Sequence, residues 1–542
     1  METKIGVFIC NCSGTLNNID FDAVVKKVVE LPGVTSIKFI SPLCLEEGKK
    51  KMLSCIREEN IEKVVVAACS PEFKEHVFRE VLENAGLNGH LFSMANIKEQ
   101  CSWVHEGDVT GKVVELIKMA VSRTRLLQPV KMNNFSVNRE VLVVGGGFEA
   151  INAALQLSRA GLRTTLLERE AVLGTGTTEL ENLCGFDINA MVMEVKGDEN
   201  IEILAPAEVI ETSGKIGDFN VRIRKGGEEI SRKYGALVIA TGYQTKLALE
   251  SKLKSDVNIV SQEKLCHMLE DPELRIRPRT IGFMLDFADE NSRLPTLATL
   301  NNALAAKRKW GSEVYVFCKN VKVDSERIER LYQEARDCGV MFLKSDVSPK
   351  VAAENGKIKI EAKDIFLGED INLTCDVLVA EECLLPAEET EALSSILNIR
   401  RDSRGFYQDE NVHLYPVASE KKGIFFIGGC RGNLDLSRVL TDVSSVVVSI
   451  YKLLSSGNIL AEVERVKVDP QKCVACLTCI RICPHNAIQL VRVDGGKEVA
   501  EICDLACEAC GICAAMCPAK AITFQGYRDE EILAQVETIG ES

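Results

Sequence analysis

The chain has 542 residues, of which 46% are hydrophobic, 27% are charged and 22 are cysteines. Its formal net charge of −14 argues against nucleic acid or an anionic membrane as a partner. It contains no apolar run near the ~18–20 residues of a membrane span, and its first residues lack a signal-peptide pattern, so we expect a cytoplasmic protein without disulfides.

The first 125 residues alternate short buried strands with amphipathic helices, which predicts a mostly parallel sheet. We expect its strands at Ile5–Ile9, Ile37–Ile40, Val64–Ala67 and Leu91–Met94. Cysteines follow these strands, at the sheet edge where parallel α/β folds bind ligands: Cys10, Cys12, Cys44, Cys69 and Cys101. Spacing alone leaves two interpretations open, the ligands of an Fe–S cluster or ordinary buried cysteines.

A dinucleotide-binding fingerprint follows in the middle of the chain. The apolar strand Val141–Val144 leads into Gly145-Gly146-Gly147-Phe148-Glu149-Ala150 and a helix, and the next strand, Leu162–Leu167, ends at Glu168. Gly145 and Gly147 allow backbone amides to approach a pyrophosphate at the helix N-terminus. Ala150 permits close packing of helix on strand, and Glu168 can accept hydrogen bonds from the ribose. This context predicts a bound dinucleotide.

Two later segments favour FAD over NAD. The strand that leads into Thr241 and Gly242 resembles an Ala-Thr-Gly turn of two-dinucleotide flavoproteins. Gly428, Gly429 and Asp435 resemble the segment that approaches the ribityl chain and second phosphate in such proteins.

A second, NAD(P)H-binding fingerprint is expected after Thr280–Leu285, but the sequence there is Asp286-Phe287-Ala288-Asp289, without glycine. Between Cys184 and Cys430 there is no C-x-x-C pair for dithiol catalysis. We find no acid–base or nucleophile constellation, and we therefore assign no catalytic residue.

Two cysteine runs near the C-terminus match the C-x2-C-x2-C-x3-C-P pattern of bacterial ferredoxins, in which the fourth cysteine serves the other cluster. The crossed assignment gives one [4Fe–4S] cluster to Cys473, Cys476, Cys479 and Cys517. It gives the other to Cys507, Cys510, Cys513 and Cys483. Structural zinc is the alternative, since Zn²⁺ also accepts four thiolates, but two complete runs disfavour it.

Together these residues resemble the HdrA-like family, the flavin-containing iron–sulfur subunits of heterodisulfide reductase in methanogens and many anaerobic bacteria. The likeness is carried by the two ferredoxin runs and by four further segments: 5–12, 65–71, 94–105 and 529–534. It implies FAD, two ferredoxin clusters and a third [4Fe–4S] cluster held by the N-terminal cysteines, with the choice between Cys10 and Cys12 left open. It also implies a hetero-oligomer with heterodisulfide-reductase B- and C-like subunits and with a dehydrogenase, hydrogenase or ferredoxin as electron donor or acceptor.

The chain departs from the family at two places around the expected flavin. The cysteine-rich stretch of the family is replaced by Asn291–Ala298, which contains no cysteine, so we expect its additional cluster to be absent. The usual Leu-Gly-Gly has become Leu173-Gly174-Thr175-Gly176. These changes leave electron bifurcation open.

We predict an α/β oxidoreductase that passes electrons between FAD and [4Fe–4S] clusters to partner subunits. Two alternatives remain: a self-contained NAD(P)H-dependent flavoprotein, and an iron–sulfur scaffold with a decayed flavin site. The predicted segments are an N-terminal parallel-sheet βαβ domain (1–125), a linker (126–139), a thioredoxin-reductase-like FAD domain (140–455) with a degenerate second nucleotide-type subdomain (about 250–395), a connector (456–467), an α+β 2[4Fe–4S] ferredoxin domain (468–525) and a C-terminal helix or tail (526–542).

Overall fold

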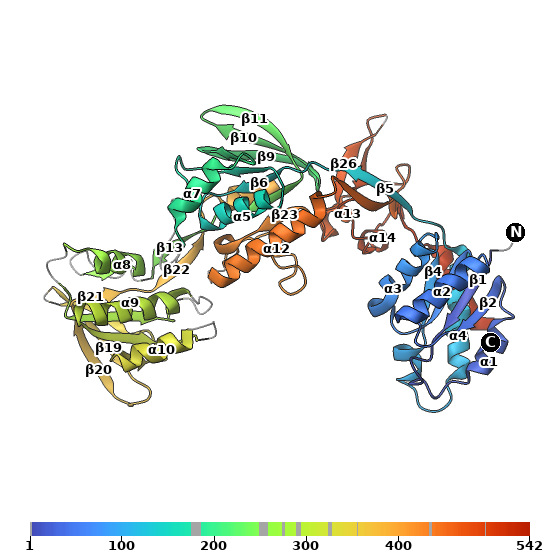
Figure 1. The fold of residues 1–542 in the computed structure, drawn as a ribbon, viewed down its shortest axis with the longest axis horizontal. Coiled ribbons are helices and arrows are strands. Elements are labelled where there is room, and N and C mark those ends of the chain that lie inside the picture. The colour runs from blue at the N-terminus through green and yellow to red at the C-terminus, as the bar shows by residue number, and fades with distance from the viewer. Residues whose placement is uncertain are drawn as a thin grey trace. The chain divides into compact units, whose positions relative to one another are not determined.

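The computed structural model of the chain describes residues 3–174, 186–248, 258–273, 277–288, 294–323, 328–354, 356–432, 436–493 and 495–541. They form two compact units (Figure 1). Unit 1 joins residues 1–135 to residues 460–542, and unit 2 comprises residues 136–459. Strands β5 (Lys131–Ser136) and β24 (Asn458–Val463) pair where the chain passes between the units.

The N-terminal part of unit 1 is a parallel four-stranded sheet of order β2-β1-β3-β4. Its strands are β1 (Ile5–Ile9), β2 (Val34–Phe39), β3 (Lys63–Ala68) and β4 (Phe92–Asn96). Helices cover both faces, which explains the continuous apolar runs of β1 and β3. One face packs against α1 (Phe21–Val28), η1 (Lys98–Ser102) and α4 (Thr110–Leu126). The other packs against α2 (Glu46–Glu58) and α3 (Pro71–Asn84).

The C-terminal part of unit 1 contains the two ferredoxin runs. Its elements are β25 (Val466–Val468), α13 (Thr478–Ile482), β26 (Ile488–Arg492), β27 (Glu498–Ile502), α14 (Ile512–Ala515), β28 (Ile522–Phe524), α15 (Asp529–Glu537) and η3 (Thr538–Glu541). The strands form two antiparallel pairs, β25 with β28 and β26 with β27. Helix α15 packs on α4, and Arg528 donates to the carbonyl oxygen of Leu126 at 2.8 Å. The end of the chain is thereby anchored to the N-terminal sheet.

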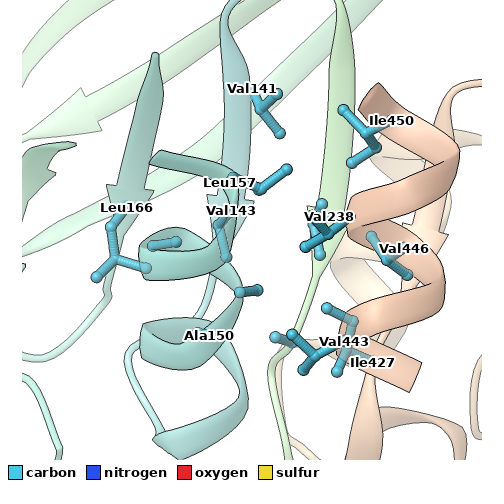
Figure 2. Packing of buried hydrophobic residues seen from close by; sticks show 14 of the residues in the cluster. Val141, Val143, Ala150, Leu157, Leu166, Val238, Ile427, Val443, Val446 and Ile450 are labelled. Atoms are coloured by element: carbon cyan, nitrogen blue, oxygen red, sulfur yellow. The ribbon is translucent and has the colours of Figure 1, made fainter. Parts of the chain in front are cut away.

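Unit 2 begins with a parallel five-stranded sheet, which we call the first sheet, of order β23-β12-β6-β7-β8. Its strands are β6 (Val141–Val144), β7 (Thr164–Leu167), β8 (Ile201–Leu204), β12 (Ala236–Ile239) and β23 (Ile424–Phe426). One face packs against α5 (Phe148–Arg159), α7 (Ile188–Gly197) and α12 (Leu436–Leu454). Figure 2 shows this core, in which Val443 and Val446 of α12 lie against Val238 and Ile427.

The other face of the first sheet packs against an antiparallel sheet and a short helix. These are β9 (Ala207–Lys215), β10 (Asp218–Lys225), β11 (Glu228–Tyr234) and α11 (Thr390–Leu397). The short η2 turn (Gly428–Arg431) joins β23 to the segment before α12.

The rest of unit 2 repeats this layering around a second sheet, of order β14-β21-β15-β16-β17. Its strands are β14 (Ile259–Val260), β15 (Thr280–Leu285), β16 (Glu313–Cys318), β17 (Met341–Lys344) and β21 (Val377–Val379). One face packs against α8 (Gln262–Glu270), α9 (Leu294–Trp310) and α10 (Ile328–Asp337). The other packs against β18 (Lys350–Glu354), β19 (Lys357–Lys363) and β20 (Asp370–Cys375). Strands β13 (Tyr243–Leu247) and β22 (Glu382–Pro386) pair between the two layered sets.

The predicted α/β fold is confirmed, and strands β1, β6 and β15 have the predicted bounds. The strand expected at Leu162–Leu167 begins at Thr164, because the ladder with β6 starts at the pair Val141–Thr164. Leu162 is buried in the turn after α5 without joining the sheet, so its apolar character reflects packing and not strand pairing. No helix among the described residues is long and apolar enough to cross a bilayer.

Candidate cofactor sites

The two ferredoxin runs fold as copies of one backbone. Ala475 (φ 52°) and Leu477 (φ 64°) are left-handed, and so are Ala509 (φ 50°) and Gly511 (φ 79°), 34 positions further along the chain. Left-handed residues other than glycine are uncommon and curl the chain tightly. Each loop can therefore direct three thiols toward one point.

The loops and the fourth cysteines surround two hollows. The first cysteine hollow, of about 410 Å³, is lined by Cys473, Cys476, Cys479 and Cys517. The second cysteine hollow, of about 330 Å³, is lined by Cys507, Cys510, Cys513 and Cys483. These are the two crossed sets of the sequence prediction.

The donor chemistry of both hollows suits an iron–sulfur cluster. Eight thiols supply the soft ligands that such clusters require. Across the described residues, no three His, Cys, Asp or Glu side chains converge closely enough to hold a single metal ion, so the thiols surround a space and not a point. The amides of Ala487 and Ala521 donate to the sulfurs of Cys483 and Cys517 at 3.4 and 3.3 Å. Such bonds tune the potential of a bound cluster.

The two hollows differ in charge. Glu508 lines the second hollow, whereas its counterpart in the first run is Val474. Burial raises the pKa of the Cys507 thiol, and the neighbouring Cys483, Cys510 and Asp504 raise it further. The second hollow is thus the more negative environment.

Four of the five N-terminal cysteines line a third hollow of about 330 Å³, the N-terminal hollow: Cys10, Cys12, Cys44 and Cys69. The amides of Cys12 and Leu43 donate to the sulfur of Cys10 at 3.3 and 3.5 Å. Lys98, which also lines the hollow, donates to the sulfur of Cys12 at 3.3 Å. The set contains both Cys10 and Cys12, as many thiols as one [4Fe–4S] cluster needs.

Cys101 lies apart from these four thiols. Its side chain is 1% exposed and belongs to the core between the sheet and α4, whereas Cys10, Cys44 and Cys69 pack with the core on the opposite face. Position after the fourth strand suggested Cys101 as a candidate ligand. The turn η1 instead directs it into the packed interior.

The glycine-rich turn of the first sheet has the backbone that a dinucleotide requires. Gly145 is left-handed (φ 129°), and a Cβ there would collide with the carbonyl group of Ala240 on the adjacent strand, so only glycine fits. Gly147 is the N-cap of α5, whose free amides form an anion site. Ala150 is fully buried between α5 and the sheet. Glu168 follows β7, and burial raises the pKa of its carboxyl.

The segments predicted to contact the rest of the FAD lie beside this turn. Strand β12, next to β6, leads to Thr241 and Gly242, and nothing lies within 4 Å of a Cβ built on Gly242. Gly428 and Gly429 follow β23, on the other side of β12. Asp435 lies outside the described residues.

Buried hydroxyls near this turn lack partners. The side-chain oxygens of Thr241, Thr390 and Tyr407 make no hydrogen bond of normal geometry with the described residues. Orphaned buried polar atoms beside open space are what a polar ligand would satisfy. The residues present therefore fit a dinucleotide.

One side chain that the sequence interpretation did not use reaches into this cradle. Glu149 is the acid within the fingerprint, and its Oε1 accepts a long hydrogen bond of 3.4 Å from the amide of Gly429. Burial raises the pKa of this carboxyl. An acid one residue before Ala150, on the first turn of α5, was the available signal.

The corresponding loop of the second sheet binds a carboxylate of the chain itself. Glu381, two residues after β21, accepts hydrogen bonds from the amides of Asp286 (3.1 Å), Phe287 (2.7 Å) and Ala288 (2.9 Å). The Asp286 side chain in turn pairs with Lys322 at 2.6 Å and accepts from Asn320 at 3.0 Å. The site is internally satisfied, and the only signal in the sequence was a glutamate where the first sheet has Thr241.

Residues 120–273 match the family described as pyridine nucleotide-disulphide oxidoreductase, and residues 466–489 match a 4Fe-4S binding domain. The chain is 26% identical to the A-type subunit of ferredoxin:CoB-CoM heterodisulfide reductase of Methanosarcina mazei, over 98% of this chain and 80% of that protein. It is 27% identical to the first A-type iron-sulfur subunit of CoB–CoM heterodisulfide reductase of Methanopyrus kandleri, over 99% of this chain and 98% of the relative. A thioredoxin reductase structure from Lactococcus lactis has 19% identity and a TM-score of 0.42, covering 59% of this chain and all of that one.

Proposed function

We propose that this chain, an oxidoreductase of the HdrA-like heterodisulfide reductase family, is the flavin and iron–sulfur electron-transfer subunit of a larger complex. The observation that carries the proposal is the combination of one glycine-rich dinucleotide cradle with three cysteine-lined hollows in a single chain. Substrate chemistry is assigned to partner subunits, because no nucleophile or acid–base set accompanies these sites among the described residues.

The proposed FAD site has its glycine turn, ribose acid and ribityl-contacting segment on three neighbouring strands. The residues assigned to it are Gly145, Gly147, Ala150, Glu168, Thr241, Gly242, Gly428, Gly429 and Asp435. When bound, FAD supplies two-electron chemistry and the [4Fe–4S] clusters supply one-electron transfer. The chain's own contribution is to position the isoalloxazine, to exclude water and to set potentials through amide–sulfur bonds and local charge.

Three clusters are proposed, one for each hollow. The N-terminal hollow would use Cys10, Cys12, Cys44 and Cys69, without Cys101. Iron quantitation of anaerobically purified protein should give about 12 Fe per chain, together with one FAD. About 8 Fe would remove the N-terminal cluster, and intact iron without flavin absorbance would favour the scaffold alternative. Cys483→Ser should lower the iron content by about 4 per chain, at the expense of the second hollow.

Partners are proposed from the names of the relatives. Those proteins are called ferredoxin-, ferredoxin/F(420)H(2)- or H(2)-dependent heterodisulfide reductase subunits. We extend this to B- and C-like heterodisulfide reductase subunits and to a ferredoxin, hydrogenase or dehydrogenase that exchanges electrons with this chain. A bifurcating complex would couple the reduction of two acceptors of different potential, whereas a simple relay would reduce either one alone.

A self-contained NAD(P)H-dependent enzyme is the second candidate, and the loop of the second sheet argues against it. The three amides that could face a pyrophosphate already bind Glu381. NADH should therefore fail to bleach the flavin of the purified chain. Stoichiometric bleaching would support the second candidate.

A further inference from the structure

We propose that Glu149 is a proton-linked gate on the flavin site: the FAD diphosphate binds when this carboxyl is neutral and is disfavoured when it is ionised. The inference rests on the proposed flavin function and concerns how that same site is regulated. It assigns to Glu149 the role of a positioning and affinity-determining residue.

Glu149 bridges the two glycine segments expected to face the diphosphate. Its Oε1 accepts from the Gly429 amide, and a Cβ built on Gly428 would lie 2.7 Å from the same oxygen. Its Oε2 lies 3.4 Å from a Cβ position built on Gly147, the N-cap of α5. The carboxyl thus occupies space between the N-terminus of α5 and η2, the space into which both glycine segments open.

No cation compensates Glu149 among the described residues. Across the turn, Gly146 separates it from Glu168, another acid. On η2 the neighbouring Cys430 is a neutral thiol, because burial raises its pKa to about 12. The next residue, Arg431, is bound by Asp409 at 2.9 and 2.5 Å and also by Asp442. Its charge is already matched, and the turn from β12 contributes only Thr241, Gly242 and Tyr243.

These surroundings make the two protonation states of Glu149 unequal toward a diphosphate. An ionised carboxylate would compete for the Gly429 amide and place a like charge beside the phosphates at low dielectric. A neutral carboxyl can donate its proton to a phosphate oxygen. Because burial raises the pKa of Glu149, the neutral form extends to higher pH than for an exposed glutamate. FAD binding should therefore take up a proton at Glu149.

The test is FAD affinity as a function of pH, measured on the full deflavinated chain by fluorescence quenching between pH 6 and 9. The wild type should lose affinity as pH rises, by up to about tenfold per pH unit where one proton is linked. Glu149→Gln, which stays neutral, should remove this slope and bind FAD at least about tenfold more tightly at pH 8. Glu199→Gln, at an exposed glutamate in the turn after α7, is the matched control and should behave as wild type.

Calorimetry of FAD binding to the wild type, in buffers of different ionisation enthalpy, gives a second readout that needs no variant. Uptake of up to one proton is expected near neutral pH, and no uptake would overturn the inference. Equal pH slopes for wild type and Glu149→Gln would overturn it as well. Loss of FAD binding by every variant at every pH would instead reject the proposed flavin function, and the gate with it.

Discussion

Unit 2 contains the same layered sheet twice, and the two copies differ in what fills the loop after the central strand. In the first sheet, β6 ends in a glycine turn that leaves α5 amides available. In the second, β15 ends at Asp286–Ala288, whose amides bind Glu381. Both loops can bind an anion, but only the first leaves the anion to come from outside. Nucleotide competence is therefore a property of loop residues and not of the shared fold.

The ferredoxin runs are a second duplication with the opposite outcome. Both copies keep their left-handed residues, their four cysteines and an amide bond to the fourth sulfur. A cluster needs every ligand, whereas an empty nucleotide site can be satisfied by one acid from the neighbouring strand.

The first prediction tests how far the glycine turn depends on its backbone. Gly145→Ala should destabilise the first sheet by more than about 3 kcal/mol and abolish FAD binding, because the added Cβ meets the Ala240 carbonyl group. Gly161→Ala is the matched control, since Gly161 is also left-handed (φ 80°) but has nothing within 4 Å. It should cost about 1 kcal/mol. Urea unfolding and flavin content would measure both, and equal effects of the two substitutions would contradict the comparison.

The second prediction removes the internal anion from the second sheet. Glu381→Ala leaves three amides without an acceptor and should destabilise the second sheet by about 2–4 kcal/mol. Glu381→Gln keeps an oxygen acceptor and should cost less. Hydrogen exchange of Asp286–Ala288 would locate the change, and FAD content should remain that of the wild type. Unchanged protection in Glu381→Ala would show that the carboxylate does not bind these amides.

The third prediction concerns pH and distinguishes the acids of the two sheets. Burial raises the folded-state pKa of Glu149 above its ordinary value of 4.5, so the folded chain binds the extra proton. Stability then falls as pH rises above 4.5, and the loss is complete above the folded-state pKa. Relative to wild type, Glu149→Gln should gain about 1–2 kcal/mol at pH 8 and progressively less toward pH 5. Glu381→Gln should show no such gain at any pH, as denaturant unfolding of flavin-free protein would reveal.

The parts of this molecule that were predictable from sequence are those that depend on neighbours along the chain. The glycine turn and the ferredoxin loops were readable because a few consecutive residues determine their backbone. Glu381 contacts Asp286 across 95 positions, and no local pattern signals that pairing. The packing of α15 on α4 was equally inaccessible, since it joins the two ends of the chain. Cys101 was a candidate for its position after a strand, but side-chain direction separates it from the other four thiols.

The smallest expected effect asks whether the ferredoxin copies are equal in energy as well as in backbone. Glu508 places a carboxylate at the second cysteine hollow where the first has Val474, which is exposed. Negative charge disfavours reduction, so Glu508→Gln should raise the potential of the second cluster by about 10–40 mV, or ~0.2–1 kcal/mol for one electron. The reciprocal Val474→Glu should lower the potential of the first cluster by a similar amount. Redox titration followed by electron paramagnetic resonance would resolve both shifts, and their dependence on ionic strength would separate a charge effect from a change in packing.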